Sequence, residues 1–539
     1  MRILVLLFIL VLPSYGLQVD YKSELEEFVQ SELSGQPTFH DIKCGTKYDL
    51  AIESNKNMLD PELYKKYILA TKAVPMRQRS MLTPAGFFML HWDDTGLHAV
   101  PQEDLSGNGY PDYIDSAAVI LDHVWKVEVE QMGYLPPPGE DGNPAIPYPI
   151  YFTNHFVYGV TWKGDIIDVN LPDTTFTSYI EIDNNFSEDY FPTKGLNGLK
   201  VTAAHEFHHA VQLGYNYRDE DIYFFEMTST WMEEYLYPDI NDYLYYLDYF
   251  FDVVSDSRFD LTNSTYPYAN SIYLQMLETQ HGASIIRSIW DKIKTEKSLS
   301  ALIMALEENN STWFESLGEY GLWLYYTGER SIPGKYFFDA PLFPQIMIKN
   351  EDKIEYDAAY VDDVNIGEIA NRYLEFEEVR GKILDIQVIA DDENDSGFRI
   401  MTPHSNSSLY PVNTQITSEP VDAEQMVLVI TNAEKNNTLS TIHINLNGSI
   451  DLTTVYPFPN PVITKDAEII RFQNVPPEAE LHIYNTSGKQ IARVENQGTS
   501  RVRSWYLIND DGQKVASGIY LFLVQGDNLL KTGKFSIVR

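Results

Sequence analysis

The hydrophobic pattern changes three times along this chain, and each change limits what the residues after it can fold into. From residue 86, short runs rich in aromatic and β-branched residues, such as GFFMLHW and SYIEIDNN, predict β-strands. From residue 198 to about 328, apolar residues recur every three or four positions, which predicts helices. Near residue 340, short alternating runs such as QMVLVITNA begin, and they predict a β-sandwich.

The 539 residues exceed what one hydrophobic core can organise, so we expect several domains. The predicted fold class is multidomain: an α+β domain, with a mixed β-sheet and then a helical subdomain, followed by two β-sandwich domains. The expected segments are, in chain order, a signal peptide, a pro-segment, the α+β domain, a β-sandwich accessory domain and an Ig-like C-terminal domain: residues 1–16, 17–79, 80–335, 336–451 and 452–539.

The N-terminal sequence MRILVLLFILVLPSYG has the pattern of a secretory signal peptide. One arginine precedes an apolar run that is too short to span a membrane, and the small residues Ser14 and Gly16 stand before the expected cleavage point. No later stretch is long and apolar enough for a transmembrane segment. We therefore expect an exported protein, secreted or held at the cell surface. Its single cysteine, Cys44, has no partner in the chain for a disulfide.

The charge of the chain argues against one class of partner. Lys and Arg number 39 and Asp and Glu number 78, which gives a formal net charge of −39. The sequence also contains no sizeable basic cluster. Because nucleic acids and anionic lipids attract basic surfaces, we expect the protein to bind neither.

The stretch VTAAHEFHHAVQLG concentrates metal-binding side chains. Residues 199–213 are expected to form a helix, which places His205 and His209 one turn apart on one face. This is the HExxH pattern, in which two imidazoles hold Zn²⁺ and the glutamate, here Glu206, accepts the proton of a water molecule. His208 lies on the other side of His205 and does not fit the pattern.

A third ligand is expected on the next helix, DIYFFEMTSTWMEEYLY, where Glu226 and Glu233 share one face. The first helix continues five residues past His209, so an antiparallel second helix must return about 7.5 Å to reach the metal. Glu226 lies at that height, whereas Glu233 would overshoot by roughly 10 Å. We therefore assign Glu226 as the third zinc ligand.

Together, HEFHH and FFEMTSTWMEE resemble the gluzincin type of zinc metallopeptidase, in particular a family of large secreted bacterial metalloproteases. The resemblance covers about residues 85–330. It implies a zincin-like fold and an endopeptidase that hydrolyses a protein or peptide substrate. It implies the same four site residues, with His205, His209 and Glu226 as zinc ligands and Glu206 as general base.

A rival hypothesis comes from another class of protein. The chain could be a surface-displayed adhesion or binding protein. In that case the β domains would bind the partner, and the protease domain would be a catalytically inactive scaffold. Thr230 stands where many gluzincins have an acidic partner for a ligand histidine. The intact Glu206 and Glu226 argue for the enzyme.

Two further features could serve the same site. The oxyanion of peptide hydrolysis needs a donor besides the metal, and TYPYANS offers Tyr266 or Tyr268, with a packing role as the alternative. Cys44, in IKCGTK, could fill the open fourth position of a catalytic zinc and keep the enzyme latent until cleavage near Arg79 removes residues 17–79. The alternative is a small buried residue.

The stretch DLSGNGYPDYID fits the twelve-residue calcium loop, with Gly109 at the sharp turn and a helical pattern after it. It predicts Ca²⁺ as a second metal with a structural role. The alternative is an Asx- and Gly-rich turn that caps the helix. The ligand positions are filled by Asp104, Ser106, Asn108, Tyr110 through its carbonyl, Asp112 and Asp115.

The C-terminal residues 454–539 resemble the sorting domain of type IX secretion and the related Ig-like module. The resemblance is carried by PNPV, ELHIYNTSGKQI, Trp505, NDDGQKVASGIYLFLV and the closing KTGKFSIVR. It implies an all-β fold with tight glycine turns and a type IX-like secretion machinery as partner. A plain β accessory domain is the alternative.

Overall fold

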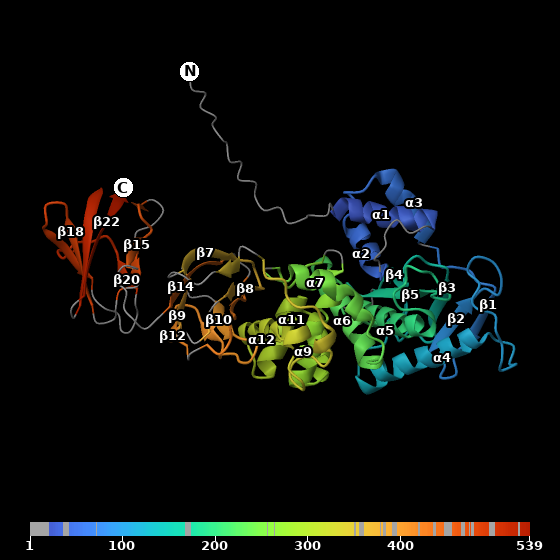
Figure 1. The fold of residues 1–539 in the computed structure, drawn as a ribbon. Helices are drawn as coiled ribbons and strands as arrows, with labels where there is room; N and C mark the ends of the chain where they lie inside the picture. The colour runs from blue at the N-terminus through green and yellow to red at the C-terminus, as the bar shows by residue number, and fades with distance from the viewer. Residues whose placement is uncertain are drawn as a thin grey trace, which may run out of the picture. The chain divides into compact units, whose positions relative to one another are not determined.

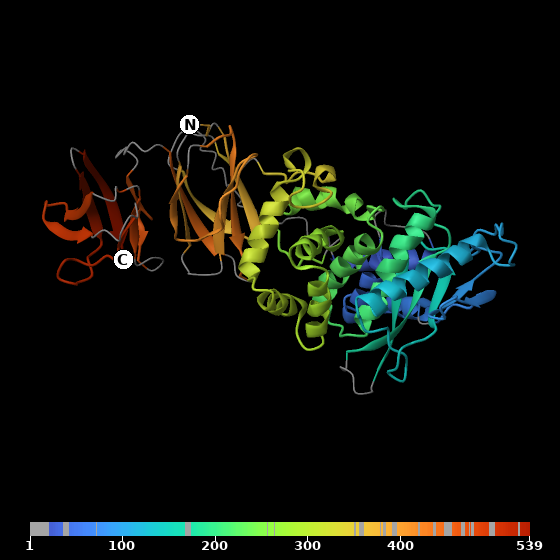
Figure 2. The same ribbon diagram turned by 90° about the horizontal axis from the view of Figure 1, so that it is seen from below.

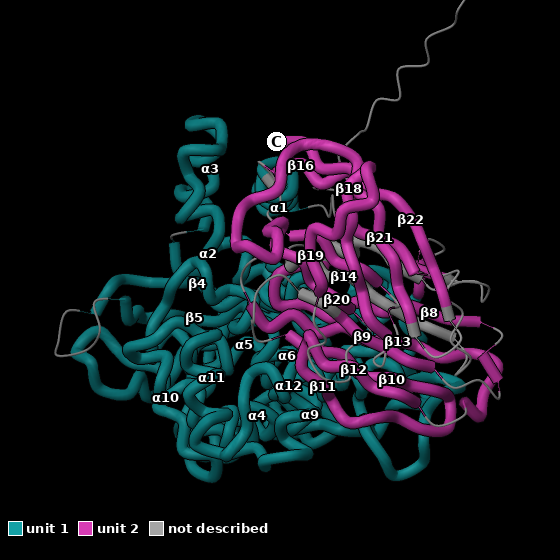
Figure 3. The backbone as a smooth tube through the Cα atoms, turned by 90° about the vertical axis from the view of Figure 1, so that its left-hand side faces the viewer, with its two compact units in different colours: residues 1–347 teal, residues 348–539 magenta. Residues whose placement is uncertain are grey.

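The computed structural model divides the chain into two compact units, residues 1–347 and 348–539 (Figure 3). The expected signal peptide, residues 1–16, lies outside the described residues. The structure describes residues 21–35, 43–71, 73–167, 174–255, 257–262, 265–349, 352–354, 360–377, 379–380, 384–390, 396–418, 421–434, 438–446, 455–464, 469–473, 475, 479–494, 502–526 and 529–539.

Three helices precede the sheet of the first unit, within the expected pro-segment. They are α1 Tyr21–Ser34, α2 Thr46–Ser54 and α3 Pro61–Thr71. The ring of Phe28 on α1 stacks on Tyr48 of α2 with centroids 4.9 Å apart, and Tyr67 of α3 meets Phe28 edge-on at 6.5 Å. These aromatic contacts join the three helices into one folded piece.

A five-stranded mixed sheet follows, in the order β1-β2-β3-β5-β4. The three inner strands β2, β3 and β5 are parallel, and the edge strands β1 and β4 run antiparallel to their neighbours. Aromatic and β-branched side chains supply the buried positions, as the sequence pattern predicts. The strands are β1 Arg79–Leu82, β2 Phe88–Trp92, β3 Tyr148–Thr153, β4 Gly159–Ile166 and β5 Phe176–Asp183.

Helices cover both faces of this sheet. The chain crosses from β2 to the parallel β3 through α4 (Asp112–Trp125) and the π-helix η1 (Lys126–Gln131), because parallel strands need a long connection. α4 packs beside α5 (Gly195–Leu213) on one face, and α1–α3 lie on the opposite side (Figures 1 and 2). α5 is buried around almost its whole circumference, so each polar side chain on it needs a partner.

The helical part of the first unit continues to Met347, beyond the expected boundary at residue 335. Phe343 packs against Tyr243 and Phe251 with ring centroids 5.9 and 6.2 Å apart, which holds the end of the segment to the helices. The helices are α6 Ile222–Leu236, α7 Leu247–Val253, α8 Tyr266–Asn270, α9 Ile272–His281, α10 Ser284–Ile293, α11 Ser298–Glu308 and α12 Trp313–Tyr325, with the 3₁₀ turns η2 Asp219–Asp221, η3 Asp242–Tyr246, η4 Gly328–Arg330 and η5 Ala340–Leu342.

The first half of the second unit holds two sheets around one apolar core that includes Leu374, Ile386 and Leu428. The sheet orders are β11-β10-β13-β8-β6 and β12-β9-β14-β7. The strands are β6 Lys353–Ile354, β7 Tyr360–Ile366, β8 Ala370–Phe376, β9 Leu384–Ala390, β10 Ser396–Met401, β11 Tyr410–Pro411, β12 Gln415–Thr417, β13 Met426–Asn432 and β14 Thr438–Leu446.

The second half has its own core around Phe472, Trp505 and Phe535, between sheets in the orders β15-β17-β20 and β16-β22-β21-β18-β19. The strands are β15 Tyr456–Phe458, β16 Val462–Ile463, β17 Ile470–Gln473, β18 Glu480–Asn485, β19 Gln490–Val494, β20 Arg503–Trp505, β21 Gly518–Gly526 and β22 Leu529–Val538. The chain is therefore multidomain, with one mixed α/β unit and further β-rich modules. None of the helices that the structure describes combines the length and apolar character needed to cross a bilayer.

Candidate metal centre

α5 and α6 run antiparallel, and this arrangement places the residues of the HExxH pattern opposite those of the following helix. Contacts link His205 to Glu233, His209 to Ser229, and Gln212 to the Phe225 carbonyl, so positions that rise along α5 meet positions that fall along α6. Among these contacts between the two helices, the carboxylate of Glu226 faces both histidines.

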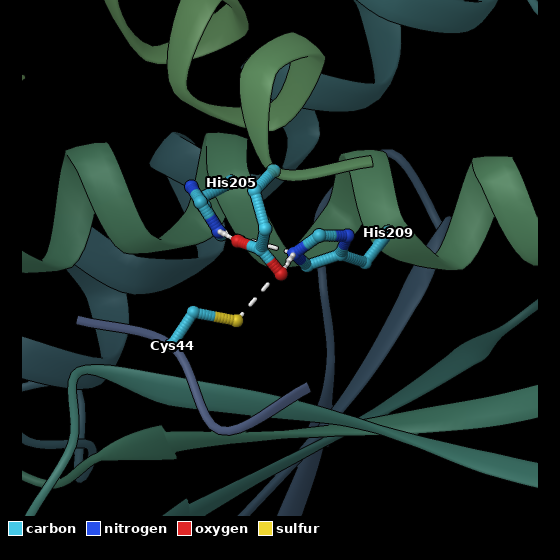
Figure 4. Close-up of side chains that lie close together, drawn as sticks. Cys44, His205 and His209 are labelled. Atoms are coloured by element: carbon cyan, nitrogen blue, oxygen red, sulfur yellow. Dashed lines mark hydrogen bonds and ion pairs between the residues drawn. The ribbon is translucent and has the colours of Figure 1, made fainter. Parts of the chain in front are cut away.

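Four side chains converge at this place: Cys44, His205, His209 and Glu226, whose ligand atoms lie within 4.8 Å of one another. Figure 4 shows Cys44, His205 and His209 pointing toward one another. The Nε2 atoms of His205 and His209 are 3.1 Å apart, and they lie 3.3 and 3.5 Å from the oxygens of Glu226. Cys44 Sγ is 3.4 Å from His209 Nε2. Donors bound to a tetrahedral Zn²⁺ at about 2.0–2.3 Å stand roughly 3.3–3.6 Å from one another. These four distances therefore lie close to those between the ligands of a tetrahedral metal site.

Burial makes a cation the natural partner of these groups. Glu226 is fully buried, and the groups that face its oxygens among the described residues are the imidazoles of His205 and His209. A buried carboxylate without a donor is costly unless a positive charge lies beside it. Burial and the nearby Glu206 and Glu226 raise the pKa of the Cys44 thiol well above its ordinary value, and a bound cation would oppose that rise by stabilising the thiolate. The residues present thus fit a divalent metal.

The far nitrogen of each imidazole is held by its own partner. His205 Nδ1 lies 2.7 Å from Glu233 Oε1, and His209 Nδ1 lies 2.7 Å from Gln212 Oε1. An Nδ1–H that donates to such a partner leaves the Nε2 lone pair for a metal and fixes the ring orientation. Glu233, which the sequence offered only as a rival ligand, therefore supports His205 instead. Thr230 does not take this role, since its hydroxyl has no hydrogen-bond partner among the described residues.

Glu206 lies beside the cluster and is held by two hydroxyl groups. Its Oε2 is 2.7 Å from Thr161 Oγ1 on β4 and 3.0 Å from Thr46 Oγ1. Gly159 on β4 permits this arrangement, because a Cβ there would stand 2.7 Å from Glu206 Cγ. Thr46 belongs to the expected pro-segment, so this segment forms a hydrogen bond to Glu206, the candidate general base.

The pro-segment reaches the cluster along the free edge of β4. The Tyr158 N–H donates to the Lys43 carbonyl at 3.1 Å, and the Gly45 N–H donates to the Gly159 carbonyl at 3.0 Å. Cys44 pairs with Gly159 in the parallel sense between these two bonds. The segment 43–47 therefore lies over the candidate site, with residues 43–45 paired to the start of β4 and with α2 beginning at Thr46.

Lys43 anchors this segment through a buried ion pair. Its Nζ lies 2.6 Å from Glu233 Oε2 and 2.5 Å from Asp242 Oδ2, and all three side chains are almost inaccessible to solvent. Burial alone would lower the pKa of Lys43, but Asp242 and Glu233 outweigh it and raise the pKa above its ordinary value. The lysine is therefore held as a cation inside the domain.

Cleavage near Arg79 stays a prediction, and the structure shows which side of this residue is exposed. Arg79 begins β1, and its guanidinium stacks over Trp92 at 5.2 Å, so the peptide bonds around it are part of the folded sheet. Proteolysis needs an exposed stretch that can enter a protease. Met76, whose side chain is 93% exposed, lies on such a stretch before the strand.

The structure separates the two candidate oxyanion donors. Tyr268 lies beside the cluster, with its ring centroid 6.1 Å from that of His205, and its buried hydroxyl lacks a hydrogen-bond partner among the residues described. Tyr266 instead packs against Phe250 with centroids 5.0 Å apart. Of the two rings, Tyr268 is the one that lies beside the cluster, and its role as a donor stays a prediction.

His208 belongs to a different buried pair. Its Nδ1 lies 2.8 Å from Glu128 Oε2 on η1, and the ring meets Tyr134 and Trp290 edge-on. Burial raises the pKa of Glu128 and lowers the pKa of His208, and both shifts favour a neutral pair. This pair is part of the packing between α5 and η1.

The predicted calcium loop forms a tight turn before α4. Asp104 accepts hydrogen bonds from the backbone N–H groups of Gly107, Asn108 and Gly109 at 2.7, 3.2 and 3.0 Å, and Asp112 accepts one from Leu105 at 2.9 Å. These bonds are those of an Asx-rich turn. Loss of solvation opposes the charged form of Asp104, but the hydrogen bonds together outweigh it and lower the pKa of this exposed carboxyl. Ca²⁺ binding stays a prediction for the loop residues.

The sequence pattern did not single out four residues around the cluster: Lys43, Thr46, Gln212 and Asp242. For two of them, Gln212 and Lys43, the sequence holds a feature that could have pointed to the site. Gln212 stands three residues after His209, which is the spacing of neighbours on a helix face, and Lys43 directly precedes the lone cysteine. Asp242 meets Lys43 only through the fold, about two hundred residues along the chain.

The fold and the site define a multidomain protein with a buried centre of His, Cys and Glu side chains. Residues 53–320, which contain α5 and α6 but not Cys44, match the model of a family described as a family of unknown function, DUF6055. No curated protein sequence matches the chain.

Three solved structures are similar to parts of the chain. PorZ, an essential surface component of the type IX secretion system of Porphyromonas gingivalis, is 21% identical over 21% of this chain and 15% of its own, with a TM-score of 0.16. Dimeric latent PorU of Porphyromonas gingivalis is 17% identical over 34% of this chain and 20% of its own, with a TM-score of 0.13. The adhesin domain of Epf from Streptococcus pyogenes is 9% identical over 34% of this chain and 73% of its own, with a TM-score of 0.14. The chain spans less than a quarter of PorZ and of PorU, and such TM-scores carry no argument about fold or function.

Proposed function

We propose that the protein is a secreted, zincin-like zinc peptidase that the segment 43–47 holds in a latent state. The observation that carries the proposal is the buried cluster of Cys44, His205, His209 and Glu226, with Glu206 beside it. Two imidazoles, one carboxylate and one thiol form a donor set that suits Zn²⁺, which accepts nitrogen, oxygen and sulfur ligands in tetrahedral geometry.

The residues divide the work of peptide hydrolysis. When bound, zinc would supply Lewis-acid activation of a water molecule and of the substrate carbonyl. Glu206 accepts the proton of the water and passes it to the leaving nitrogen, while Thr161 keeps its carboxylate in place. The hydroxyl of Tyr268 donates to the oxyanion that forms on the carbonyl.

Latency follows from what the segment 43–47 covers. Cys44 takes the position that substrate or water needs, Thr46 donates to the carboxylate of Glu206, and the backbone occupies the edge of β4. A thiolate is a strong zinc ligand, so water would not displace it readily. Removal of the segment would free all three positions together.

The test uses the intact chain with a site-specific protease sequence inserted beside Met76, so that the protein folds before it is cut; we call the cut product the activated protein. We expect about one zinc per chain and peptide hydrolysis that a chelator abolishes. Glu206→Gln should keep the zinc and lose activity by about 10²–10⁴-fold, because the base is gone while the ligands remain. Glu226→Gln should lose the zinc itself.

Wild-type activity of the Glu206→Gln protein would contradict the mechanism, and a chain that never acquires metal would contradict the site. A zinc-loaded activated protein without hydrolytic activity would instead favour an adhesion or binding protein on an inactive scaffold. The exposed Glu220→Gln is the control, since it makes the same charge change on the turn before α6.

We also propose that residues 452–539 direct export through a type IX-like machinery. The sequence resemblance carries this part. The separate core around Phe472 and Phe535 supports it, because a sorting module has to fold by itself to be recognised as a unit.

A further inference from the structure

We propose that this peptidase selects substrates with a lysine or arginine beside the scissile bond, bound in an anionic pocket of Glu233 and Asp242 that Lys43 occupies in the latent chain. The inference rests on the proposed function and names the substrate class of the same site.

The walls of the pocket come from the body of the domain and not from the pro-segment. Lys43 Nζ lies 2.6 Å from Glu233 on α6 and 2.5 Å from Asp242 on η3. The ring of Tyr246 lies 5.1 Å from the same Nζ, which adds a cation–π contact. Tyr158 donates from its hydroxyl to the second oxygen of Asp242 at 3.0 Å. These groups remain on the domain after the pro-segment leaves.

The pocket is next to the position where a substrate would react. Glu233 joins the two places, because its other oxygen lies 2.7 Å from Nδ1 of the ligand His205. Lys43 directly precedes Cys44, whose sulfur lies 3.4 Å from His209 Nε2. In a bound substrate, one residue would lie at the metal, as Cys44 does here. Lys43 therefore occupies the position of the substrate residue next to it.

The backbone of the segment shows how a substrate could reach the pocket. Lys43 and Gly45 exchange backbone hydrogen bonds with Tyr158, which precedes β4, and with Gly159, its first residue. The edge of a sheet accepts any extended peptide through its main-chain groups, and pockets beside it then select side chains. A substrate that replaces the segment uses the same edge, and one of its side chains enters the space left by Lys43.

Charge selects which side chain enters. Without Lys43, Glu233 retains the contact with the His205 ring and Asp242 retains the Tyr158 hydroxyl, but the lysine ammonium that joined the two buried carboxylates is gone. Buried carboxylates that lose their counter-charge are destabilised. A lysine or arginine restores the charge balance, whereas leucine or methionine of similar length leaves it unmet.

The activated protein is tested on a peptide library, and cleavage sites are mapped by mass spectrometry. We expect Lys or Arg to be enriched at one position beside the cleaved bond. Asp242→Asn should lower the preference for Lys over Met at that position by about tenfold or more, because it removes the charge but keeps an acceptor for Tyr158. Asp242 touches no metal ligand, so zinc content should stay at one per chain. Asp248→Asn on α7 is the control, since this exposed residue makes the same charge change.

Chelator-sensitive cleavage without a basic preference, or with a preference that Asp242→Asn leaves intact, overturns the pocket and leaves the peptidase standing. Absence of any cleavage overturns the proposed function and this inference with it. A chain that carries Gly45→Ala, which loosens the segment without cutting, provides a second route to the same assay. The two preparations should show the same preference.

Discussion

Two glycines allow the segment 43–47 and the metal centre to share one strand. A Cβ on Gly45 would overlap Val160 Cγ2, and a Cβ on Gly159 would stand 2.7 Å from Glu206 Cγ. In both places the requirement is space and not backbone freedom, since Gly45 has an ordinary φ of −82°. At the residue scale, latency therefore depends on the close approach of two backbones as much as on the thiol.

The first residue-scale prediction follows from this contact. Gly45→Ala in the uncut chain forces the segment away from β4, and overpacking of this kind costs about 1–3 kcal/mol. We expect peptidase activity of the uncut protein to rise by roughly 5- to 150-fold, measured as chelator-sensitive hydrolysis.

The compensating change provides the control. Val160→Ala removes the methyl groups that the new Cβ meets, so the double variant Gly45→Ala/Val160→Ala should return toward the latent level. Equal activity of wild type and Gly45→Ala, with Cys44 still at the cluster, would contradict a blocking role for the segment.

At the scale of elements, the pairing of α5 with α6 decides which glutamate binds metal. The antiparallel return places Glu226 level with both histidines, and the seven residues from there to Glu233 correspond to two helical turns. Glu233 thus stays on the same face but reaches His205 from the side of Nδ1. One helix face supplies the ligand and its supporting partner.

The loop before α4 gives an element-scale prediction. Asp104 organises the turn through its backbone contacts, and in a calcium loop it would also be the first ligand. Asp104→Ala should then lower the melting temperature of the protein in calcium by more than in a chelator, because a bound ion stabilises only the folded state. The measurement is thermal unfolding in both media. An equal loss in the two would assign the loop to helix capping alone.

At the scale of the whole molecule, the two compact units separate the proposed tasks. The cluster, its supporting residues and the segment 43–47 all lie in the first unit, and the sorting-like module lies in the second. The module has a core of its own, so its loss leaves the core of the first unit unchanged.

Deletion of residues 452–539 tests this separation. We expect the shortened protein to cross the inner membrane and remain in the periplasm of a type IX-secreting host, where an immunoblot of cell fractions would detect it. The activity of the shortened protein after cutting should match that of the full chain. Release of the shortened protein into the medium at the full-length level would assign the module a different role.

Local patterns in the sequence determined a large part of this protein. The strands β2, β3, β4 and β5, the helix that carries HEFHH and the return helix with its glutamate follow from residue periodicity, because neighbours on one face depend only on helical and strand geometry. The same geometry puts His205 and His209 on one side of α5, and the antiparallel return of α6 brings Glu226 to them. Partners within one helical turn of a ligand, such as Gln212 beside His209, could also have been predicted from the sequence spacing.

Only the tertiary structure decided the rest. Lys43 meets Glu233 and Asp242 across about two hundred residues, and Thr46 meets Glu206 across 160. No periodicity relates residues so far apart, since each contact depends on how the segment 43–47 packs against the start of β4 and against α5 and α6. The same limit applies to Tyr266 and Tyr268, because only the packing of α8 shows which of two nearby rings faces the cluster.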